Sequence, residues 1–236
     1  MLLILACSII LISALVQTAI GFGMALIAVP FLILIDPLMV PAPVVMIALV
    51  QLAISAWVHK ADIQWRPVLM ATIARVPGTV LAIWLMSSSG IEGIKLFIAC
   101  SVFVAVAISL LKIQAQPSIR NHLIAGFFSG LGGTTTGIGG PPMALLYQHQ
   151  HGDLVRANLS AFFVIGSLIS LIGMAIGGFI TTQSWVYFLY FLPATLIGVW
   201  LGLKVKHLLK PEFMRPAILI LCSCSAVVLF LQTLLS

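Results

Sequence analysis

Charged side chains are scarce in this sequence. Only 7% of its 236 residues are charged, whereas 62% are hydrophobic. Soluble domains carry about a quarter charged residues, so this composition excludes a soluble globular protein. We therefore expect an all-α integral membrane protein that contacts the lipid bilayer and has no nucleic-acid partner.

Cysteine is also rare, and its spacing carries no known chemistry. The four cysteines lie within apolar runs and form neither a CxxC redox motif nor a zinc pattern. His149, His151 and Asp153 share one loop, where we expect solvated side chains instead of metal ligands. The sequence therefore predicts no metal site and no cofactor.

Catalytic patterns are absent as well. Ser129 precedes Gly130, but the glycine on its N-terminal side is Gly126, one residue too far away for the GxSG motif of intramembrane serine proteases. No membrane-embedded histidine follows to act as a base, and no pair of aspartates is present. We therefore do not expect an enzyme.

Long apolar runs make up most of the chain and set its organisation. A helix needs about 20 apolar residues to cross a bilayer, so the first run is too long for a single span. The runs cover residues 2–35, 40–58, 67–87, 93–111, 121–147, 155–180, 184–203 and 213–235.

The stretch from Gly126 to Pro142 interrupts the fifth run. It contains seven glycines, two prolines and three consecutive threonines. Glycine costs a helix about 1 kcal/mol and an interior proline about 3 kcal/mol. Lipid cannot satisfy the backbone groups that such a break leaves free, so the break must be buried in protein or line a cavity. Broken helices of this kind commonly hold the substrate of a transporter.

The two halves of the chain are related by an internal repeat at an offset of 116 residues. We infer a first repeat over residues 1–116 and a second over residues 117–236. The offset relates Gly21-Phe-Gly23 to Gly137-Ile-Gly139, Pro77 to Pro193, and Trp84 to Trp200.

Basic residues predict the orientation of each half. Nine of the eleven Lys and Arg fall in or beside the loops 59–66, 112–121 and 204–215 or near residue 156, which places these segments in the cytoplasm. Equivalent loops of the two halves then lie on opposite sides, with both termini in the periplasm. We expect two inverted repeats in the membrane, each a re-entrant hairpin of two short helices followed by three spans. Eight ordinary spans in two parallel halves are the alternative.

The hairpin tips are the predicted substrate site. Glycines let backbone N–H groups approach a ligand closely, and a helix that starts at such a turn favours an anion. Small residues that only permit close helix packing are the alternative interpretation. The predicted site residues at the tips are Gln17, Gly21, Gly23, Thr134, Thr135, Thr136, Gly137, Gly139, Gly140 and Pro141.

Arg75 is the strongest single candidate for binding an anion. It follows Arg66 by nine residues, which places it about 13 Å into the membrane at helical rise. A buried arginine there is costly and no acidic residue shares its run, so an anionic substrate is a natural partner. Snorkelling to the interface is the alternative. Asn158, near the start of run 155–180, completes the predicted site.

The two tip stretches carry a family resemblance. Gln17-Thr-Ala-Ile-Gly-Phe-Gly-Met-Ala-Leu-Ile-Ala-Val-Pro30 and Ser129-Gly-Leu-Gly-Gly-Thr-Thr-Thr-Gly-Ile-Gly-Gly-Pro-Pro142 resemble the duplicated signature of the sulfite exporter TauE/SafE family. The resemblance implies a secondary transporter that moves sulfite, sulfoacetate or other sulfonates across the bacterial inner membrane. An anion channel is the alternative, and protons are a candidate coupling ion.

Overall fold

The structure, a computed structural model, describes residues 1–110, 116–147, 150 and 152–205. For residues 90–110 it describes the backbone, and the exposure of Gly93 and Cys100 alone. The described chain forms eight α-helices, α1 to α8, and two short 3-10 helices, η1 and η2, without strands. It is therefore all-helical, as predicted. The predicted span 213–235 lies outside the described residues.

The first predicted hairpin consists of α1 (Leu2–Ile20) and α2 (Met24–Ile35). Gly21 and Gly23 adopt φ angles of 104° and 119°, which L side chains rarely adopt, so glycine is what permits the tight reversal. The two arms are unequal, because α1 has 19 residues and α2 has 12. The first arm is therefore longer than the short helix that we expected.

The second hairpin consists of α5 (Ile119–Thr135) and α6 (Gly140–Leu146). The hydroxyl of Ser118 caps the start of α5 by accepting from the backbone N–H of Asn121 at 3.2 Å. At the tip, Gly137 has a φ of 79°, and prolines occupy the first positions of α6.

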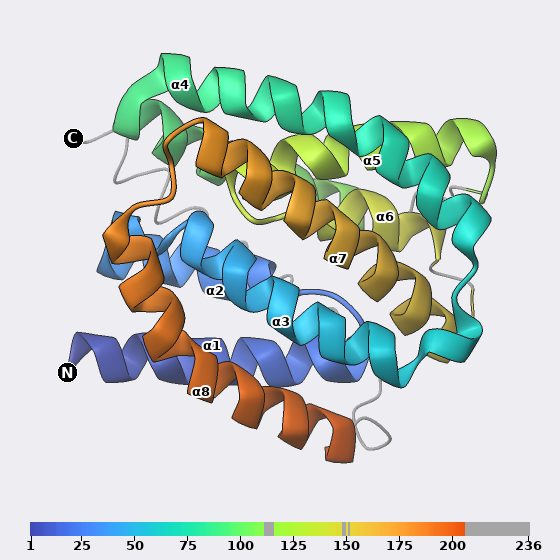
Figure 1. Cartoon of the computed structure of the whole chain (residues 1–236), viewed down its shortest axis with the longest axis horizontal. Coiled ribbons are helices and arrows are strands. Elements are labelled where there is room, and N and C mark those ends of the chain that lie inside the picture. The colour runs from blue at the N-terminus through green and yellow to red at the C-terminus, as the bar shows by residue number, and fades with distance from the viewer. Residues whose placement is uncertain (111–115, 148–149, 151, 206–236) are drawn as a thin grey trace.

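A longer helical stretch follows the first hairpin. It comprises η1 (Pro37–Met39), α3 (Ala42–Val58), η2 (Lys60–Asp62) and α4 (Trp65–Leu110). In Figure 1 the green part of α4 doubles back, so this one helix makes two passes through the bundle.

The apolar runs 67–87 and 93–111, which we expected to be separate spans joined by a loop at 87–91, belong to one helix that continues through these residues, so that loop is wrong. The hydroxyls of Ser87 and Ser88 donate to the carbonyls of Ile83 and Trp84 at 2.9 and 2.8 Å. A serine hydroxyl that donates to the carbonyl four residues earlier often bends a helix without ending it.

Two long helices complete the described chain, α7 (Gly152–Ile176) and α8 (Thr182–Val205). Within the described residues, five segments are long and apolar enough to cross a membrane, which makes the protein a multi-pass membrane protein. These segments are Leu2–Ile20, Pro37–Val58, Trp65–Ser89, Gly152–Ile176 and Thr182–Val205.

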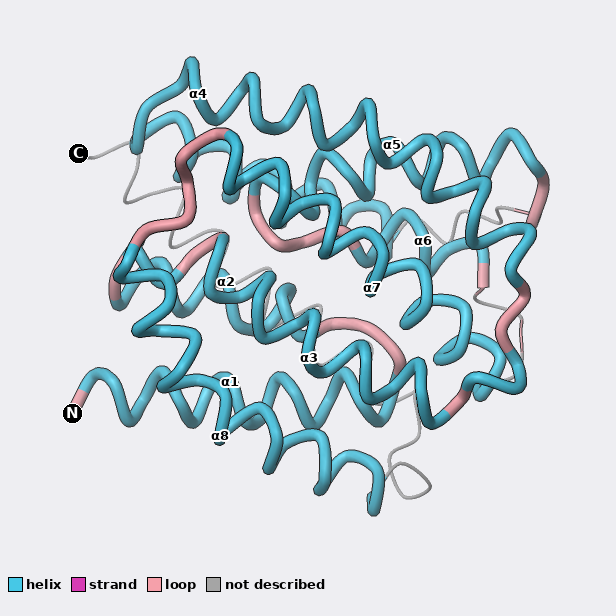
Figure 2. The backbone as a smooth tube through the Cα atoms, in the orientation of Figure 1, coloured by secondary structure: helices cyan, strands magenta, loops and turns pink. Residues whose placement is uncertain are grey.

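The two hairpins open toward opposite ends of the bundle. In Figures 1 and 2, the α1–α2 hairpin opens toward the left end and the α5–α6 hairpin toward the right end. The tips meet inside the protein, where Ile138 of the second tip joins the apolar core formed by α1 and α2. This arrangement positions the candidate site, whereas the inverted repeat and its boundary at residue 116 stay predictions.

Candidate functional site

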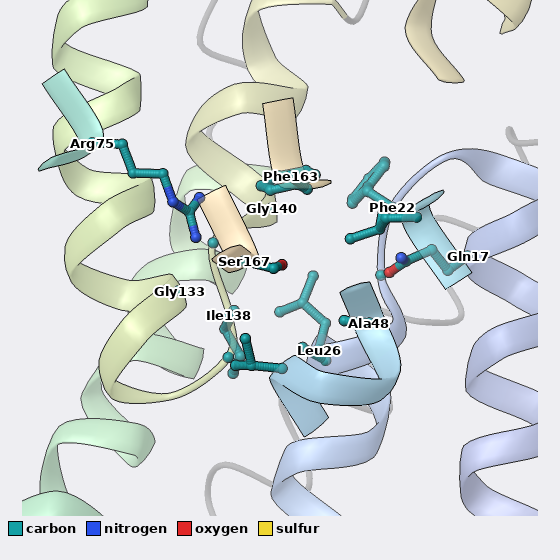
Figure 3. Close-up of a pocket in the computed structure, with 16 residues that line it drawn as sticks. Gln17, Phe22, Leu26, Ala48, Arg75, Gly133, Ile138, Gly140, Phe163 and Ser167 are labelled. Atoms are coloured by element: carbon teal, nitrogen blue, oxygen red, sulfur yellow. The ribbon is translucent and has the colours of Figure 1, made fainter. Parts of the chain in front are cut away.

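A small cavity lies where the two hairpin tips meet α3, α4 and α7 (Figure 3). It offers about 50 Å³ to the centres of water molecules, enough for roughly three or four of them. Both tips contribute to its wall. The lining residues are Gln17, Phe22, Gly23, Ala25, Leu26, Val45, Ala48, Leu52, Arg75, Gly133, Gly137, Ile138, Gly139, Gly140, Phe163 and Ser167.

Arg75 supplies the cationic group of this cavity. Its side chain is 3% exposed, so it does not reach an interface by snorkelling. Nη1 donates to the hydroxyl of Ser129 at 3.0 Å and Nη2 donates to that of Ser170 at 3.3 Å. Nε is buried without a hydrogen-bond partner. Among the described residues, no carboxylate forms an ion pair with this guanidinium.

Three glycines make room for the guanidinium. A Cβ on Gly133 would lie 2.8 Å from Nη2 of Arg75, and one on Gly130 would lie 2.9 Å from its Cγ. A Cβ on Gly166 of α7 would overlap Nε and the central carbon of the guanidinium. The sequence therefore keeps small residues on α5 and α7 where Arg75 passes between them.

A line of hydroxyls fixes the guanidinium in place. The hydroxyl of Thr134 lies 3.1 Å from that of Thr79 and 2.7 Å from that of Ser170. On the other side, Ser129 donates to the carbonyl of Gly139 at 2.7 Å. These partners are all neutral, so they orient the arginine without compensating its charge.

Aromatic rings pack against the same group. The guanidinium carbon of Arg75 lies 5.2 Å from the ring centroid of Phe162 and 5.9 Å from that of Phe163. Both distances fall within the range of cation–π attraction, which stabilises a buried cation modestly. Across the cavity from Arg75, Figure 3 shows the apolar ring of Phe22 and, beside it, the amide of Gln17.

Gln17 belongs to the first tip. Its side-chain oxygen accepts the backbone N–H of Met24, the first residue of α2, at 2.9 Å. The side chain therefore acts as a cap that ties the end of α1 to the start of α2. It lines the cavity beside Gly23.

The structure brings half of the predicted site residues to the cavity. Those that line it are Gln17, Gly23, Arg75, Gly137, Gly139 and Gly140. Those that do not line it are Gly21, Thr134, Thr135, Thr136, Pro141 and Asn158.

Local contacts explain why several of the predicted site residues do not line the cavity. The hydroxyls of Thr135 and Thr136 donate to carbonyls of their own helix, at 2.8 and 2.7 Å, which leaves them turned toward the backbone. Asn158 is fully buried at the start of α7, where its oxygen accepts the backbone N–H of Gln64 at 2.7 Å. A Cβ on Gly21 would lie 3.3 Å from Cγ of Arg156, so this glycine packs against α7.

Sequence reasoning missed the residues that α7 contributes. Phe163, Ser167 and Ser170 follow one another at spacings of four and three, which places them on one face of a helix. The signal was present, because serine is unusual in so apolar a run. Ser129, which joins Arg75 to the second tip, was also missed.

Comparison with known proteins identifies the family. No curated protein and no solved structure matches this chain. A family model described as "Sulfite exporter TauE/SafE" matches residues 5–229, nearly the whole chain. Such a match indicates a membrane transporter that exports sulfite or related sulfur-containing anions. The chain belongs to the sulfite exporter TauE/SafE family.

Proposed function

We propose that this protein is a secondary transporter of small sulfur-containing anions across the bacterial inner membrane, with sulfite and simple sulfonates as substrates. The substrate anion binds in the cavity between the two hairpin tips. Arg75 supplies the opposite charge, while the glycines of the tips let backbone N–H groups approach the anion.

One observation carries this proposal. Arg75 is buried, lines the cavity and has no carboxylate partner among the described residues. An uncompensated buried charge is costly, and a bound anion offsets that cost. The unpartnered Nε of the guanidinium adds a donor for an anionic oxygen.

The arrangement of the hairpins supports a carrier. The cavity lies between two broken helices that open toward opposite ends of the bundle (Figure 1). Movement of either hairpin relative to the other would open the cavity to one side at a time, which is how carriers with inverted repeats work.

Exchange flux in proteoliposomes tests this function. Vesicles loaded with unlabelled methanesulfonate should accumulate labelled methanesulfonate or sulfite from outside, and the initial rate should saturate with concentration. A Cβ at Gly140 would lie 3.6 Å from Phe22, an ordinary contact, so Gly140→Val should fold while its methyl groups fill the cavity. We expect this variant to lose exchange.

Gly173→Ala is the matched control. It lies on α7 and does not line the cavity, and the atoms nearest to its Cβ would be side-chain carbons of Thr79 and Ile83 at 3.3 Å, which can shift slightly. It should keep exchange near the wild-type rate. Flux that does not saturate, with single-channel currents, would identify an anion channel instead. Full exchange by the Gly140→Val variant would show that the anion does not pass through this cavity.

A further inference from the structure

His59 lies outside the cavity, at the end of α3, and is 5% exposed. Its Nδ1 lies 2.9 Å from the carbonyl oxygen of Ser55. A carbonyl can only accept a hydrogen bond, so Nδ1 carries the proton of the neutral ring. Nε2 is then an acceptor with a free lone pair.

The group that faces Nε2 is also an acceptor. The carboxylate of Asp153 lies 3.6 Å from it, and Nε2 is buried without a hydrogen-bond donor. Two acceptors that face each other repel. A proton on Nε2 would replace this repulsion with an ion pair, since an opposite charge at this distance favours the charged form of histidine.

His122 serves as a comparison, because its Nε2 faces a hydroxyl instead of a carboxylate. It is equally buried, and its Nδ1 lies 2.8 Å from the carbonyl of Ser118. Its Nε2, however, lies 3.5 Å from the hydroxyl of Tyr147, which can donate. The ring of His122 is therefore satisfied in its neutral form.

The pair at His59 is connected to the first hairpin tip. Nη1 of Arg156 donates to the carboxylate of Asp153 at 3.0 Å. Nε and Nη2 of the same arginine donate to the carbonyl of Ala19, near the end of α1, the former at 3.1 Å. A charged His59 would compete with Arg156 for one carboxylate. The other charged side chains on η2 and at the start of α4 are Lys60, Asp62 and Arg66.

A buried polar stripe on α3 continues from His59 toward the tip. Ser55 and Gln51 follow at spacings of four, on the same side of the helix. Ser55 accepts from Ser160 of α7 at 2.8 Å, and the amide of Gln51 donates to Thr18 of α1 at 3.0 Å. The side-chain oxygen of Gln51 is buried without a hydrogen-bond partner.

We propose that Nε2 of His59 is a proton-binding site whose charge acts on the first hairpin tip through Asp153 and Arg156. The proton adds to the lone pair of Nε2, the imidazolium pairs with Asp153, and the hold of Arg156 on the carbonyl of Ala19 changes. Proton binding is thereby coupled to the position of the tip. The coupling to transport rests on the function proposed above, whereas the protonation of His59 does not.

Nuclear magnetic resonance of the purified full chain with ¹⁵N-labelled histidine tests the protonation directly. On acidification we expect a proton at Nε2 of His59, which faces a carboxylate, in preference to Nε2 of His122, which faces a hydroxyl. Loss of one signal in each of the variants His59→Gln and His122→Gln assigns the two rings. Asp153→Asn should lower the protonated-to-neutral ratio of His59 several-fold at a given pH. A His59 that stays neutral, or that ignores Asp153→Asn, would overturn the proposal.

Proteoliposomes test the coupling. Methanesulfonate is a suitable probe because its own charge does not change with pH. His59→Gln should keep methanesulfonate exchange at equal pH but lose its acceleration by a pH gradient, and His122→Gln should keep both. Absence of exchange in the wild-type protein would contradict the proposed function. Normal exchange with an intact response to the gradient in His59→Gln would contradict the proton site.

Discussion

At the scale of single residues, the candidate site depends on one uncompensated charge. Arg75 is held by the hydroxyls of Ser129 and Ser170, which orient it but leave its charge available. A carboxylate in place of either serine would form an ion pair with the guanidinium and neutralise its charge. The choice of neutral partners is therefore what suits this arginine to an exchangeable anion.

Replacement of Arg75 tests its role in binding. A charge-assisted hydrogen bond contributes about 1.5–3 kcal/mol, so Arg75→Ala should weaken anion binding by about ten- to more than a hundredfold. Arg75→Lys should restore binding only in part, because an ammonium cannot present two parallel N–H groups to a sulfonate. Calorimetric titration of the purified variants with methanesulfonate measures both effects. An unchanged dissociation constant in Arg75→Ala would reduce this residue to a packing role.

Substitution of Gly166 tests the role of Arg75 in anion binding without removing the charge of the guanidinium. Because a Cβ at this position would overlap the guanidinium, Gly166→Ala should displace Arg75 from Ser129 and Ser170. We expect a loss of anion affinity that approaches that of Arg75→Ala, measured by the same titration. Gly173→Ala, two turns along the same helix, should bind normally. Normal binding by the Gly166→Ala variant would show that the position of the guanidinium is not critical.

At the scale of elements, glycines bring helix backbones into direct contact. A Cβ on Gly126 of α5 would fall on the carbonyl of Ala71 in α4, and one on Gly78 of α4 would fall on the carbonyl of Phe127. Backbones can approach this closely only where side chains are absent, as at other small-residue interfaces in membranes. This contact holds Arg75 of α4 beside the second hairpin.

Gly126→Val should therefore destabilise the α4–α5 pair. Overpacking of a tight contact costs about 1–3 kcal/mol or more, so the purified variant should unfold at a lower temperature than the wild type. Phe128→Val is the control on the same helix, because Phe128 is 55% exposed and its truncation leaves the contact intact. Equal unfolding temperatures for the Gly126→Val variant and the wild type would mean that α4 and α5 can separate freely.

At the scale of the whole molecule, the charge distribution bears on orientation. Several helix ends lie toward the right end of Figure 1, namely the end of α3 and the starts of α4, α5 and α7, while α8 ends below them. Basic residues are concentrated at these ends: Lys60, Arg66, Arg120, Arg156 and Lys204. From the positive-inside rule we expect this end to face the cytoplasm.

Cysteine labelling tests this orientation. In a background that lacks Cys7, Cys100, Cys222 and Cys224, single cysteines replace the exposed residues Ala61 and Thr182. A membrane-impermeant maleimide should label Thr182→Cys in intact cells and Ala61→Cys only after the inner membrane is permeabilised. The reverse pattern would show that the basic end faces the periplasm.

The sequence alone determined the class of the protein and the positions of the two hairpin turns. Low charge and long apolar runs indicate a membrane protein wherever they occur, and the glycines at 21, 23 and 137 predicted turns that the structure confirms with positive φ angles. These signals are readable because hydropathy and backbone freedom are local properties of the chain. The burial of Arg75 followed from its depth within an apolar run in the same way.

Only the tertiary structure decided which side chains surround the cavity. Ser129 and Ser170 lie 54 and 95 residues from Arg75 in sequence, and the packing of α4, α5 and α7 brings them together. Thr135 and Thr136 looked equally suitable as ligands, yet their hydroxyls bond to their own helix. No local pattern separates these cases, because the direction of a hydroxyl depends on which helix packs against it and on whether a nearer carbonyl accepts its proton.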